Sequence, residues 1–369
     1  MAQIALDARK YFDFGIGTYI QSLITGFEQH RDKHDFTLFV PEQDTARIHV
    51  DSAIRIIPVP YKKYSLGELF GFKSMMQNYA IDLFHEPHFT LPFGLQKNSV
   101  VTIHDLIHLK CSEFFSLPQR MYARQMLSHA VNHSGRILTV SQRTKQDIQE
   151  FFSVPEERIS VIYNGVGRIF RKIEDEQKLK AFKIRYSLER PFVLYVGNVK
   201  PHKNIPLLLM AFSRLRLTYP DLLLVVVGGN LKSDVSLTAM VNELNISHSI
   251  KELGQISNDD LVLAYNSAQM LVQPSLYEGF GFPVIEAMAC GTPVICSDGG
   301  SLPEIAGNAA LIISKRSMDG LLDSMTKLLD HNELRLDLIK KGFQNSKRFC
   351  WEQTAKETIG MYDLTLRHQ

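Results

Sequence analysis

The sequence predicts an α/β protein built from two doubly wound parallel sheets, and three observations support this prediction. Short runs rich in Val, Ile and Leu alternate with helical patterns along the chain, which is typical of parallel sheets covered on both faces. The chain has 369 residues, 45% of them hydrophobic, which is enough for two domains with cores of their own. A charged stretch, residues 168–190, separates two series of apolar runs and is typical of a linker followed by a solvated helix.

The first series of apolar runs predicts the strands of an N-terminal Rossmann-like domain, residues 1–170. These strands are Ile4–Asp7, Phe36–Val40, Ile54–Val59, Leu83–His85, Val100–His104 and Ile137–Val140. Helical patterns separate most of them, as the crossover connections between parallel strands require.

The second series predicts a C-terminal Rossmann-like domain, residues 171–349. Its strands are Phe192–Val196, Leu222–Val227, Met270–Gln273, Pro293–Ser297 and Ala310–Ile313. Helical patterns over Ile205–Thr218 and Asp259–Ala268 lie between them. Because ligands bind beyond the carboxyl ends of the strands in open parallel sheets, candidate site residues are sought where strands end.

Charge and composition exclude several classes of protein. The net charge is +2 with acidic and basic residues interspersed, so nothing indicates a nucleic-acid-binding surface. The N-terminus lacks a signal-peptide pattern and no apolar run approaches about eighteen residues, so a cytoplasmic protein is expected. Cys111, Cys290, Cys296 and Cys350 are scattered, which favours reduced thiols over a disulfide or metal role.

The most informative pair of residues is Glu278 and Glu286, which flank a glycine-rich turn and the start of a helix. The segment between the two acids begins with Gly279, Phe280, Gly281 and Phe282. Pro283 is suited to the first position of a helix over Val284–Cys290. Glycines permit close approach of the backbone, and a helix N-terminus attracts anions, so this segment could hold a diphosphate without a metal.

The two carboxylates suggest complementary contacts with a nucleotide sugar. Glu278 precedes the turn and could accept hydrogen bonds from sugar hydroxyls, while Glu286, on the first helical turn, could bind a ribose diol in bidentate fashion. The alternative is that Glu286 is simply an acid favoured by the helix dipole.

The spacing of Glu278 and Glu286 resembles the E-x7-E pattern of the retaining nucleotide-sugar transferases of glycosyltransferase family 4, which have the GT-B fold. Further segments agree with that family in type and order: GIGTYI (15–20), TIHDL (102–106), VGNVKPHKN (196–204), VVVGG (225–229) and GTPVICSDGGSLPEIAG (291–307). The resemblance implies two domains facing across a cleft, with the acceptor on the N-terminal domain and the donor on the C-terminal one. It also implies that a final helix, residues 350–369, packs back on the N-terminal domain. Trp351, Ala355, Ile359 and Tyr362 form an apolar stripe suited to this, although a surface helix of the second domain is the alternative.

Two glycine-containing segments resemble known phosphate-binding motifs without completing them. Gly15 and Gly17 begin a dinucleotide fingerprint, but Ile20 replaces its third glycine, which disfavours nicotinamide binding. The alternative is a plain strand-to-helix turn. The family resemblance makes Gly17 part of a loop that approaches the donor phosphates or the acceptor.

The segment 197–204 nearly matches a P-loop, but His202 and Asn204 occupy positions that require glycine and Ser or Thr. Lys203 remains at the opening of a helix, where its ammonium could neutralise a diphosphate. Many family members carry arginine where Asn198 stands here. A clamp of two cations is therefore in doubt unless Lys200 or His202 contributes.

His104 ends an apolar strand and is the candidate residue of the N-terminal half. In the family a histidine at this motif contacts the donor sugar near the reacting carbon; the alternative is a packed structural histidine. His85, His88 and His108 lie close in sequence and could in principle assemble a metal site with it, but they match no zinc-enzyme motif.

The resemblance implies a retaining hexosyltransferase, most similar to bacterial mannosyltransferases of polysaccharide and O-antigen assembly. GDP-mannose is the expected donor, a saccharide or undecaprenyl-linked saccharide is the expected acceptor, and no cofactor or metal is expected. The alternatives are a GDP-rhamnose, dTDP-rhamnose or UDP-hexose donor, a nucleotide-sugar epimerase, or a non-catalytic sugar-nucleotide-binding protein. Basic amphipathic segments, residues 62–76 and 120–129, could contact the cytoplasmic face of the inner membrane, although core-facing helices explain them too.

Overall fold

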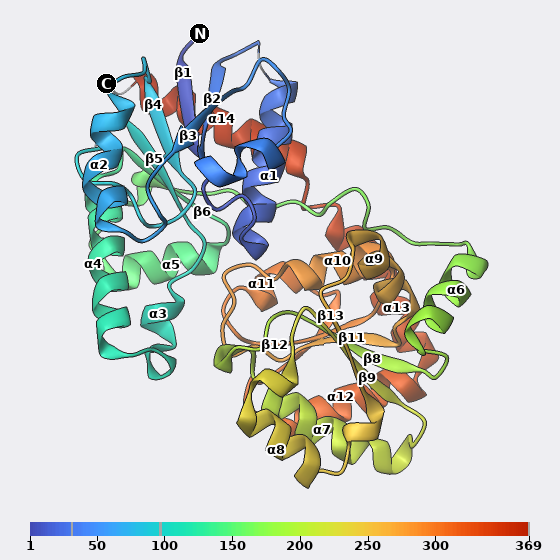
Figure 1. The fold of residues 1–369 in the computed structure, drawn as a ribbon. Helices are drawn as coiled ribbons and strands as arrows, with labels where there is room; N and C mark the ends of the chain where they lie inside the picture. The colour runs from blue at the N-terminus through green and yellow to red at the C-terminus, as the bar shows by residue number, and fades with distance from the viewer. Residues whose placement is uncertain (31, 96–97, 368–369) are drawn as a thin grey trace. The chain divides into compact units, whose positions relative to one another are not determined.

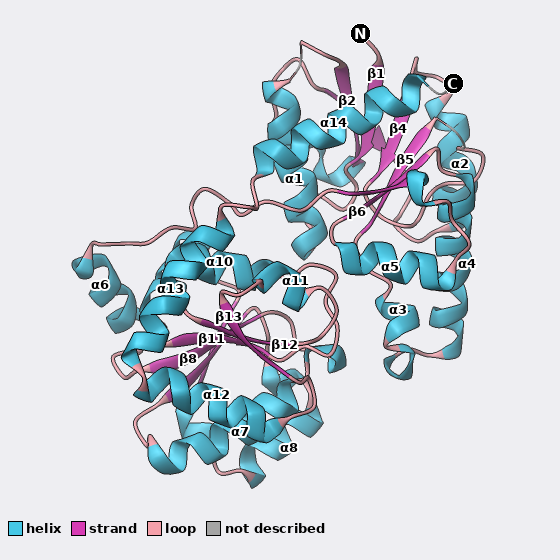
Figure 2. Cartoon of the chain, turned by 180° about the vertical axis from the view of Figure 1, so that it is seen from behind, coloured by secondary structure: helices cyan, strands magenta, loops and turns pink. Residues whose placement is uncertain are grey.

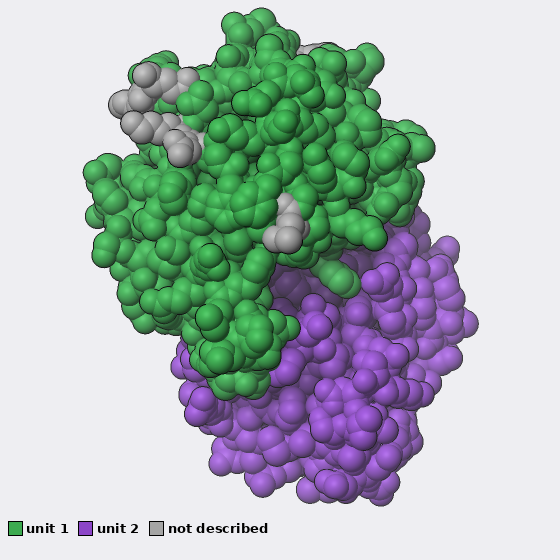
Figure 3. Space-filling view, turned by 60° about the vertical axis from the view of Figure 1, so that its left-hand side comes forward, with its two compact units in different colours: residues 1–165, 350–369 green, residues 166–349 purple. Residues whose placement is uncertain are grey.

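The computed structural model describes residues 1–30, 32–95 and 98–367, and the chain forms two compact units (Figure 3). The N-terminal unit comprises residues 1–165 together with the C-terminal segment from residue 350. The C-terminal unit comprises residues 166–349. Residues 368 and 369, which belong to the predicted final segment, lie outside the described part.

The N-terminal unit contains a parallel sheet in the order β3-β2-β1-β4-β5-β6-β7 (Figure 1). Its strands are β1 (Gln3–Asp7), β2 (Asp35–Pro41), β3 (Arg55–Val59), β4 (Leu83–Glu86), β5 (Ser99–Ile103), β6 (Arg136–Thr139) and β7 (Ile159–Val161). β1 pairs with β2 on one side and with β4 on the other, with Ile4 opposite both Phe36 and Leu83. The chain therefore reverses its direction of winding between β1 and β4.

Helices cover both faces of this sheet. They are α1 (Phe14–Gln29), α2 (Leu66–Met76), α3 (Ile107–Lys110), α4 (Leu117–His133), α5 (Gln142–Phe151) and α14 (Trp351–Arg367), with 3-10 turns η1 (Glu42–Arg47), η2 (Ser112–Phe114) and η3 (Glu156–Arg158). Apolar residues of α1 and α14 form one core cluster, and those of α2, α4 and α5 form another. The strands between them are apolar on both faces, as parallel strands require.

The final helix α14 packs on α1, which confirms the predicted return of the chain to the N-terminal domain (Figures 1 and 2). A Cβ on Gly26 would lie 2.1 Å from the Cβ of Ala355, so the two helices can approach this closely because residue 26 is glycine. Tyr362 is fully buried, and its hydroxyl lies 2.6 Å from Nδ1 of His85 on β4. The predicted apolar stripe therefore faces the N-terminal core.

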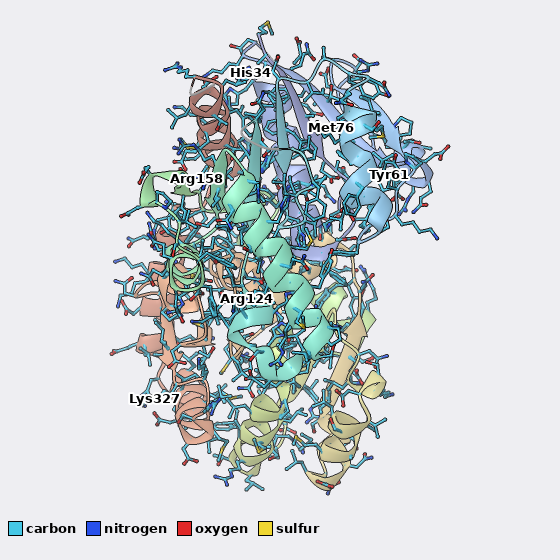
Figure 4. All side chains as sticks on the ribbon, turned by 90° about the vertical axis from the view of Figure 1, so that its left-hand side faces the viewer. His34, Tyr61, Met76, Arg124, Arg158 and Lys327 are labelled. Carbon is cyan, nitrogen blue, oxygen red and sulfur yellow. The ribbon has the colours of Figure 1, made fainter. Side chains whose placement is uncertain are left out.

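The long helix α4 is held at both ends, and Figure 4 labels Arg158, which holds its C-terminal end. Ser116 and Gln119 form a capping box at its start. At its other end, the guanidinium of Arg158 donates hydrogen bonds to the carbonyl oxygens of Val131, at 3.0 Å, and Ser134. A cation at a helix C-terminus satisfies carbonyl groups that have no partner within the helix.

The C-terminal unit contains a second parallel sheet in the order β10-β9-β8-β11-β12-β13. Its strands are β8 (Phe192–Val196), β9 (Leu223–Val227), β10 (Ile250–Gly254), β11 (Met270–Gln273), β12 (Val294–Ser297) and β13 (Ala310–Ile313). Here the winding reverses between β8 and β11. The predicted fold class, two doubly wound parallel sheets, is confirmed.

The helices of the C-terminal unit also form two layers, with α7, α8 and α12 on one face of the sheet and α9, α10 and α11 on the other (Figures 1 and 2). The helices are α6 (Glu176–Tyr186), α7 (Ile205–Thr218), α8 (Val235–Glu243), α9 (Asn258–Ser267), α10 (Phe282–Cys290), α11 (Leu302–Ala306), α12 (Met318–Asp330) and α13 (Asn332–Ser346), with 3-10 turns η4 (Pro201–Lys203), η5 (Leu231–Ser233) and η6 (Ser247–Ser249). α6 is the helix expected in the charged stretch, and it begins with Asp175 as N-cap.

Candidate active site

Lys203 and Glu278 meet at the point where the C-terminal sheet reverses its winding. Lys203 follows β8, Glu278 follows β11, and these strands are neighbours. The ammonium of Lys203 lies 2.7 Å from Oε1 of Glu278 and 2.8 Å from Oε2. Because ligands bind at this kind of switch point in open parallel sheets, the pair marks the candidate site of the unit.

The carboxylate of Glu278 is held ionised and in place by several donors. Besides Lys203, Gln273 Nε2 donates to Oε1 at 2.9 Å and Ser275 Oγ donates to the same oxygen at 2.7 Å. Burial opposes ionisation, but the charge of Lys203 and these hydrogen bonds outweigh it and lower the pKa of Glu278. The side chain is therefore a fixed anion with a fixed orientation.

The backbone of the Glu278 turn is supported by the segment after β12. A Cβ on Gly299 would lie 2.2 Å from the carbonyl oxygen of Ser275, and one on Gly300 would lie 2.2 Å from that of Glu278. Only glycine permits this approach. Ser301 Oγ donates to the carbonyl oxygens of Glu278, at 3.1 Å, and Phe280, at 2.8 Å. Sequence reasoning noted this segment only as a family motif and missed its role; the paired glycines after a buried strand were the available signal.

Helix α10 begins earlier than the sequence indicates. Gly281 is its N-cap, with φ of 107°, and the helix starts at Phe282, so Pro283 takes the second position and not the first. The expectation that Glu286 lies on the first turn is therefore wrong: it lies on the second turn, because left-handed Gly281 ends the loop one residue sooner. Phe280 is buried and packs edge-on against Phe349, with ring centroids 5.6 Å apart.

Glu286 has an environment that favours its neutral form. Tyr265 donates a hydrogen bond from its hydroxyl to Oε2 of Glu286 at 2.8 Å. Burial raises the pKa of Glu286 to about 7, and the hydrogen bond from Tyr265 opposes this shift only in part. The carboxyl group can therefore change its charge near neutral pH.

The loop after β8 presents Asn198 and Lys203. Asn198 has a buried side-chain oxygen, Oδ1, without a hydrogen-bond partner in the described part of the chain. Asn204 adopts a left-handed conformation with φ of 54°. Its Nδ2 donates to the carbonyl oxygens of Pro274, at 3.1 Å, and Lys315, at 2.8 Å, which ties the Lys203 turn to two neighbouring loops.

Gly17 lies inside α1 and not in a loop, so the expected placement is wrong. α1 begins at Phe14, immediately after a turn, and a Cβ on Gly17 would lie 2.4 Å from the carbonyl oxygen of Tyr11. This close packing of the turn on the helix explains the glycine structurally. Whether Gly17 contacts a ligand stays a prediction.

His104 lies at the end of β5 as a neutral histidine. Its Nε2 lies 2.9 Å from the carbonyl oxygen of Pro87, to which only an N–H can donate, and its ring meets Tyr19 edge-on with centroids 5.0 Å apart. Burial lowers the pKa of His104 to about 4. The neutral ring is suited to hydrogen bonding with a sugar hydroxyl, and its contact with the donor stays a prediction.

His85 is a core residue. Its two ring nitrogens lie 2.6 Å from the hydroxyl of Tyr362 and 2.7 Å from that of Thr102, and burial lowers the pKa of His85 to about 3. Within residues 1–30, 32–95 and 98–367, no group of three or more His, Cys, Asp or Glu side chains is arranged to hold a metal ion. Cys111, Cys290, Cys296 and Cys350 are free thiols.

Both basic amphipathic segments bury some apolar side chains and expose others. In the first segment Leu69 and Phe72 are buried in the N-terminal core and Phe70 is 64% exposed, while the side chain of Leu66 lies outside the described part. On α4, Met121 is 63% exposed, next to the exposed Arg124, which Figure 4 labels. In the described residues, no helix combines the length and the apolar character needed to cross a bilayer.

The two doubly wound parallel sheets define a class of fold, and comparison with solved structures agrees. The chain superimposes on sucrose-phosphate synthase from Thermosynechococcus elongatus with a TM-score of 0.81 over the whole of both chains, at 21% sequence identity. At this identity the likeness shows the fold, which is that of the GT-B glycosyltransferases.

Sequence comparisons identify the family. Residues 15–167 match the family model described as Glycosyltransferase Family 4, and residues 176–345 match the model described as Glycosyl transferases group 1. The chain is 31% identical to O-antigen chain mannosyltransferase B of Escherichia coli over 98% of both chains. It is 33% identical to O-antigen chain mannosyltransferase RfbU of Salmonella typhimurium over 66% of this chain and 64% of that one. The chain therefore belongs to glycosyltransferase family 4, as its motifs predict, and is a glycosyltransferase.

Proposed function

We propose that the protein transfers a mannosyl unit from GDP-mannose to a saccharide or lipid-linked saccharide of an O-antigen type, with retention of anomeric configuration. The observation that carries this proposal is the Lys203–Glu278 pair beside the N-terminus of α10. It combines a cation suited to a diphosphate with a fixed carboxylate suited to sugar hydroxyls. The choice of mannose and of an O-antigen acceptor is supported by the names of the two relatives.

In this proposal the C-terminal unit binds the donor. Glu286 binds the ribose diol, Lys203 and the free N–H groups at the start of α10 bind the diphosphate, and Glu278 orients the sugar. The same diphosphate-binding site is lined by Asn198, Gly279 and Gly281 and by the rings of Phe280 and Phe282. Stabilising the charge that develops on the leaving diphosphate, together with positioning, would supply most of the rate enhancement.

The N-terminal unit would present the acceptor, and His104 would contact the transferred sugar. The proposal assigns no enzymic nucleophile. The acceptor oxygen attacks the anomeric carbon on the face that the diphosphate leaves, the bond from that carbon to the phosphate oxygen breaks, and the departing phosphate takes the acceptor proton. Each atom is thereby accounted for without a cofactor.

Product analysis tests the proposal. The protein is incubated with GDP-mannose, GDP-rhamnose, dTDP-rhamnose and UDP-hexoses, each with and without synthetic mannosides and undecaprenyl-linked saccharides. A new α-mannosidic bond formed only from GDP-mannose supports the proposal. Interconversion of the donor without acceptor would make the protein an epimerase, and binding without turnover would make it a sugar-nucleotide-binding protein. Inverted configuration in the product, read by NMR, would exclude retention.

The same assay with EDTA tests the metal-free arrangement. Because Lys203 supplies the positive charge in this proposal, turnover should persist in EDTA. Loss of turnover in EDTA, with recovery on addition of magnesium, would mean that a divalent cation and not Lys203 stabilises the leaving group.

Peripheral contact of α4 with the cytoplasmic face of the inner membrane is a further part of the proposal. It rests on the exposed Leu117 and Met121 next to the exposed Arg124. Sedimentation with phosphatidylethanolamine–phosphatidylglycerol vesicles should remove the protein from the supernatant, and Arg124→Glu should reduce this effect. Equal sedimentation of both proteins would exclude this surface.

A further inference from the structure

Tyr265 on α9 contacts Glu286 on α10 through its hydroxyl. The two helices pack against each other, and Tyr265 lies in the last turn of α9. Its side chain is fully buried, and its hydroxyl donates to Oε2 of Glu286 at 2.8 Å. Burial raises the pKa of Tyr265 well above its usual value, so the hydroxyl keeps its proton and acts as the donor. One helix thereby supplies a donor to an acid that belongs to another.

The phenol of Tyr265 is itself held in place through its backbone and its ring. Thr292, just before β12, donates from Oγ1 to the carbonyl oxygen of Tyr265 at 2.6 Å. The backbone N–H of Ala268 donates to the same oxygen at 3.2 Å. The ring of Phe170 meets the ring of Tyr265 edge-on, with centroids 6.0 Å apart. A side chain that packing has already ordered loses little further conformational entropy when its hydroxyl binds an acceptor.

The carboxyl group of Glu286 has one restrained oxygen and one that is still available. Among the described residues, Tyr265 donates to Oε2, and Oε1 receives no hydrogen bond. Glu286 is also partly exposed. The terminal torsion of a glutamate is broad, so a carboxyl group without a fixed partner adopts many orientations. The hydrogen bond from Tyr265 restricts this rotation while Oε1 remains an acceptor.

Resting on the proposed transferase function, we propose that Tyr265 is a positioning residue for the donor nucleotide. By holding Oε2 of Glu286, its hydroxyl keeps Oε1 in one orientation, in which Oε1 accepts a hydrogen bond from a ribose hydroxyl. Glu278, the other acid of the motif, is held in a comparable way by Lys203 and Gln273. An acceptor that is already oriented loses less binding free energy to the ordering of its own side chain.

The variant Tyr265→Phe removes the hydroxyl and keeps the ring. Calorimetry measures the Kd of GDP and of 2′,3′-dideoxy-GDP, with UDP and 2′,3′-dideoxy-UDP in parallel so that the test does not depend on guanine. The measurement is made at pH 9, well above the pKa of about 7 of Glu286, so that a change reports orientation and not charge. Wild type should bind GDP about tenfold more tightly than its dideoxy analogue, the effect of a hydrogen bond to a charged group. In Tyr265→Phe this ratio should fall at least threefold.

Tyr186→Phe is the matched control. Tyr186 on α6 also donates from its hydroxyl to a carboxylate of α9, that of Asp260, at the same distance of 2.8 Å. This variant should keep the ratio of the two Kd values within twofold of wild type. Each variant loses one hydrogen bond, so both can lower Tm. A merely structural Tyr265 predicts a lower Tm with an unchanged ratio, whereas a positioning Tyr265 predicts a lower ratio.

The double variant Tyr265→Phe, Glu286→Ala tests whether Tyr265 acts through Glu286. If it does, the Kd of GDP should equal that of the single variant Glu286→Ala within twofold. A further loss of affinity would overturn the positioning role, because Tyr265 would then act through another group. In steady-state assays, Tyr265→Phe should raise the KM for GDP-mannose at least threefold and change kcat less, as expected when a contact is present before and during the reaction.

Failure of the positioning role differs from failure of the proposed function. If wild type and Tyr265→Phe distinguish GDP from its dideoxy analogue equally well, the positioning role is overturned and the donor site stands. If wild type binds each nucleotide and its dideoxy analogue with equal affinity, both the ribose contact of Glu286 and the role of Tyr265 are overturned. If the expected ratios are found but no sugar is transferred, the transferase function fails while Tyr265 still positions Glu286 for a nucleotide.

Discussion

The two sheets place acids and bases at equivalent positions but complete their hydrogen bonding differently. In the C-terminal unit, both carboxylate oxygens of Glu278 accept hydrogen bonds from Lys203, and Gln273 adds another. In the N-terminal unit, Glu86 and Arg9 each keep a buried polar atom without a partner in the described residues. The contrast concerns the acids alone, because Asn198 and Gln273 of the C-terminal unit also each keep a buried oxygen without a partner in the described residues. A carboxylate whose oxygens are already paired is preorganised, whereas an unpaired group gains its partner from a ligand.

The two units should respond to acid in opposite ways, which is the largest effect we expect. Burial lowers the pKa of His85 to about 3 and of His104 to about 4, and burial and then Lys10 lower that of His88 well below 6.5. The unfolded chain protonates these histidines below about pH 6.5. Unfolding of the N-terminal unit therefore takes up protons, so the stability of this unit decreases as the pH is lowered. Burial also lowers the pKa of His108 and His129 in this unit, which adds to the proton uptake, whereas the folded state holds one proton on Glu86 that the unfolded state lacks, which offsets part of it. Each proton of the net uptake changes the stability by about 1.4 kcal/mol per pH unit.

In the C-terminal unit the sign is reversed. The pKa of Glu286 is raised by burial to about 7 from 4.5, so the folded unit holds an extra proton between these values and gains stability as pH falls through them. Trp351 is the single tryptophan and belongs to the N-terminal unit, so its fluorescence reports that unit. At pH 5 the fluorescence transition should precede the loss of hydrogen-exchange protection in β8–β13. Coincident transitions at pH 5 and pH 7 would contradict the contrast.

Removing Lys203 should have the next largest effect, because it leaves the partly buried carboxylate of Glu278 without its cation. Lys203→Ala should destabilise the C-terminal unit by about 3 kcal/mol and lower kcat more than it weakens nucleoside binding. The double variant Lys203→Ala, Glu278→Gln is the control and should recover stability but not activity. A double variant no more stable than the single one would show that the pair does not hold the turn together.

Glu286→Ala should weaken binding of GDP by roughly 1.5–3 kcal/mol, the range for a hydrogen bond to a charged group. If the ionised form binds the ribose diol, the affinity of the wild type should rise with pH and level off above about 7. Tyr265→Phe removes the hydrogen bond that lowers the pKa of Glu286, so it should move this pH profile upward. Calorimetry measures both effects, and unchanged affinity in a folded Glu286→Ala variant would exclude the ribose contact.

The smallest expected effect concerns His104, which tests whether the N-terminal edge takes part in turnover. His104→Asn should lower kcat tenfold or more, about 1.4 kcal/mol, with GDP binding nearly intact. The matched control is His85→Asn, which should lower Tm and spare kcat, because His85 bonds only to core hydroxyls in the described chain. Melting curves and steady-state rates are measured in parallel. A destabilised His104→Asn protein with normal kcat would place His104 among the packing residues.

Much of the fold could be predicted because its central strands are apolar on both faces. The runs that contain β1, β5, β8 and β9 are each recognisable from sequence alone. The pattern misses β7, which has only three residues, and β10, a half-buried edge strand with the sequence IKELG. Edge strands bury less surface, so their side chains need not be apolar.

The candidate site could be predicted only where its residues are close in sequence. Glu278 and Glu286 share one contiguous motif, and Lys203 opens a recognisable turn. Asp7 and Glu68 come from distant segments, so no spacing relates them, and only the fold brings both carboxylates to Arg9. Charged residues immediately after apolar strands, as in IALDAR and LFHEP, were the available signal. The exact start of α10 depended on the left-handed conformation of Gly281, which a sequence pattern does not specify.

The return of α14 to the first sheet has a consequence for the order in which the chain folds during synthesis. The C-terminal unit is continuous and complete by residue 349, whereas Ile359 and Tyr362 fill the core of the unit that begins at residue 1. We therefore expect the C-terminal unit of the nascent chain to reach its native state first. The N-terminal unit cannot complete its core until α14 has been synthesised and packs on it. A chain that ends at residue 349 and has been released from the ribosome should show protease resistance in residues 166–349 and sensitivity in residues 1–165. The reverse pattern would mean that the first sheet is stable without its last helix.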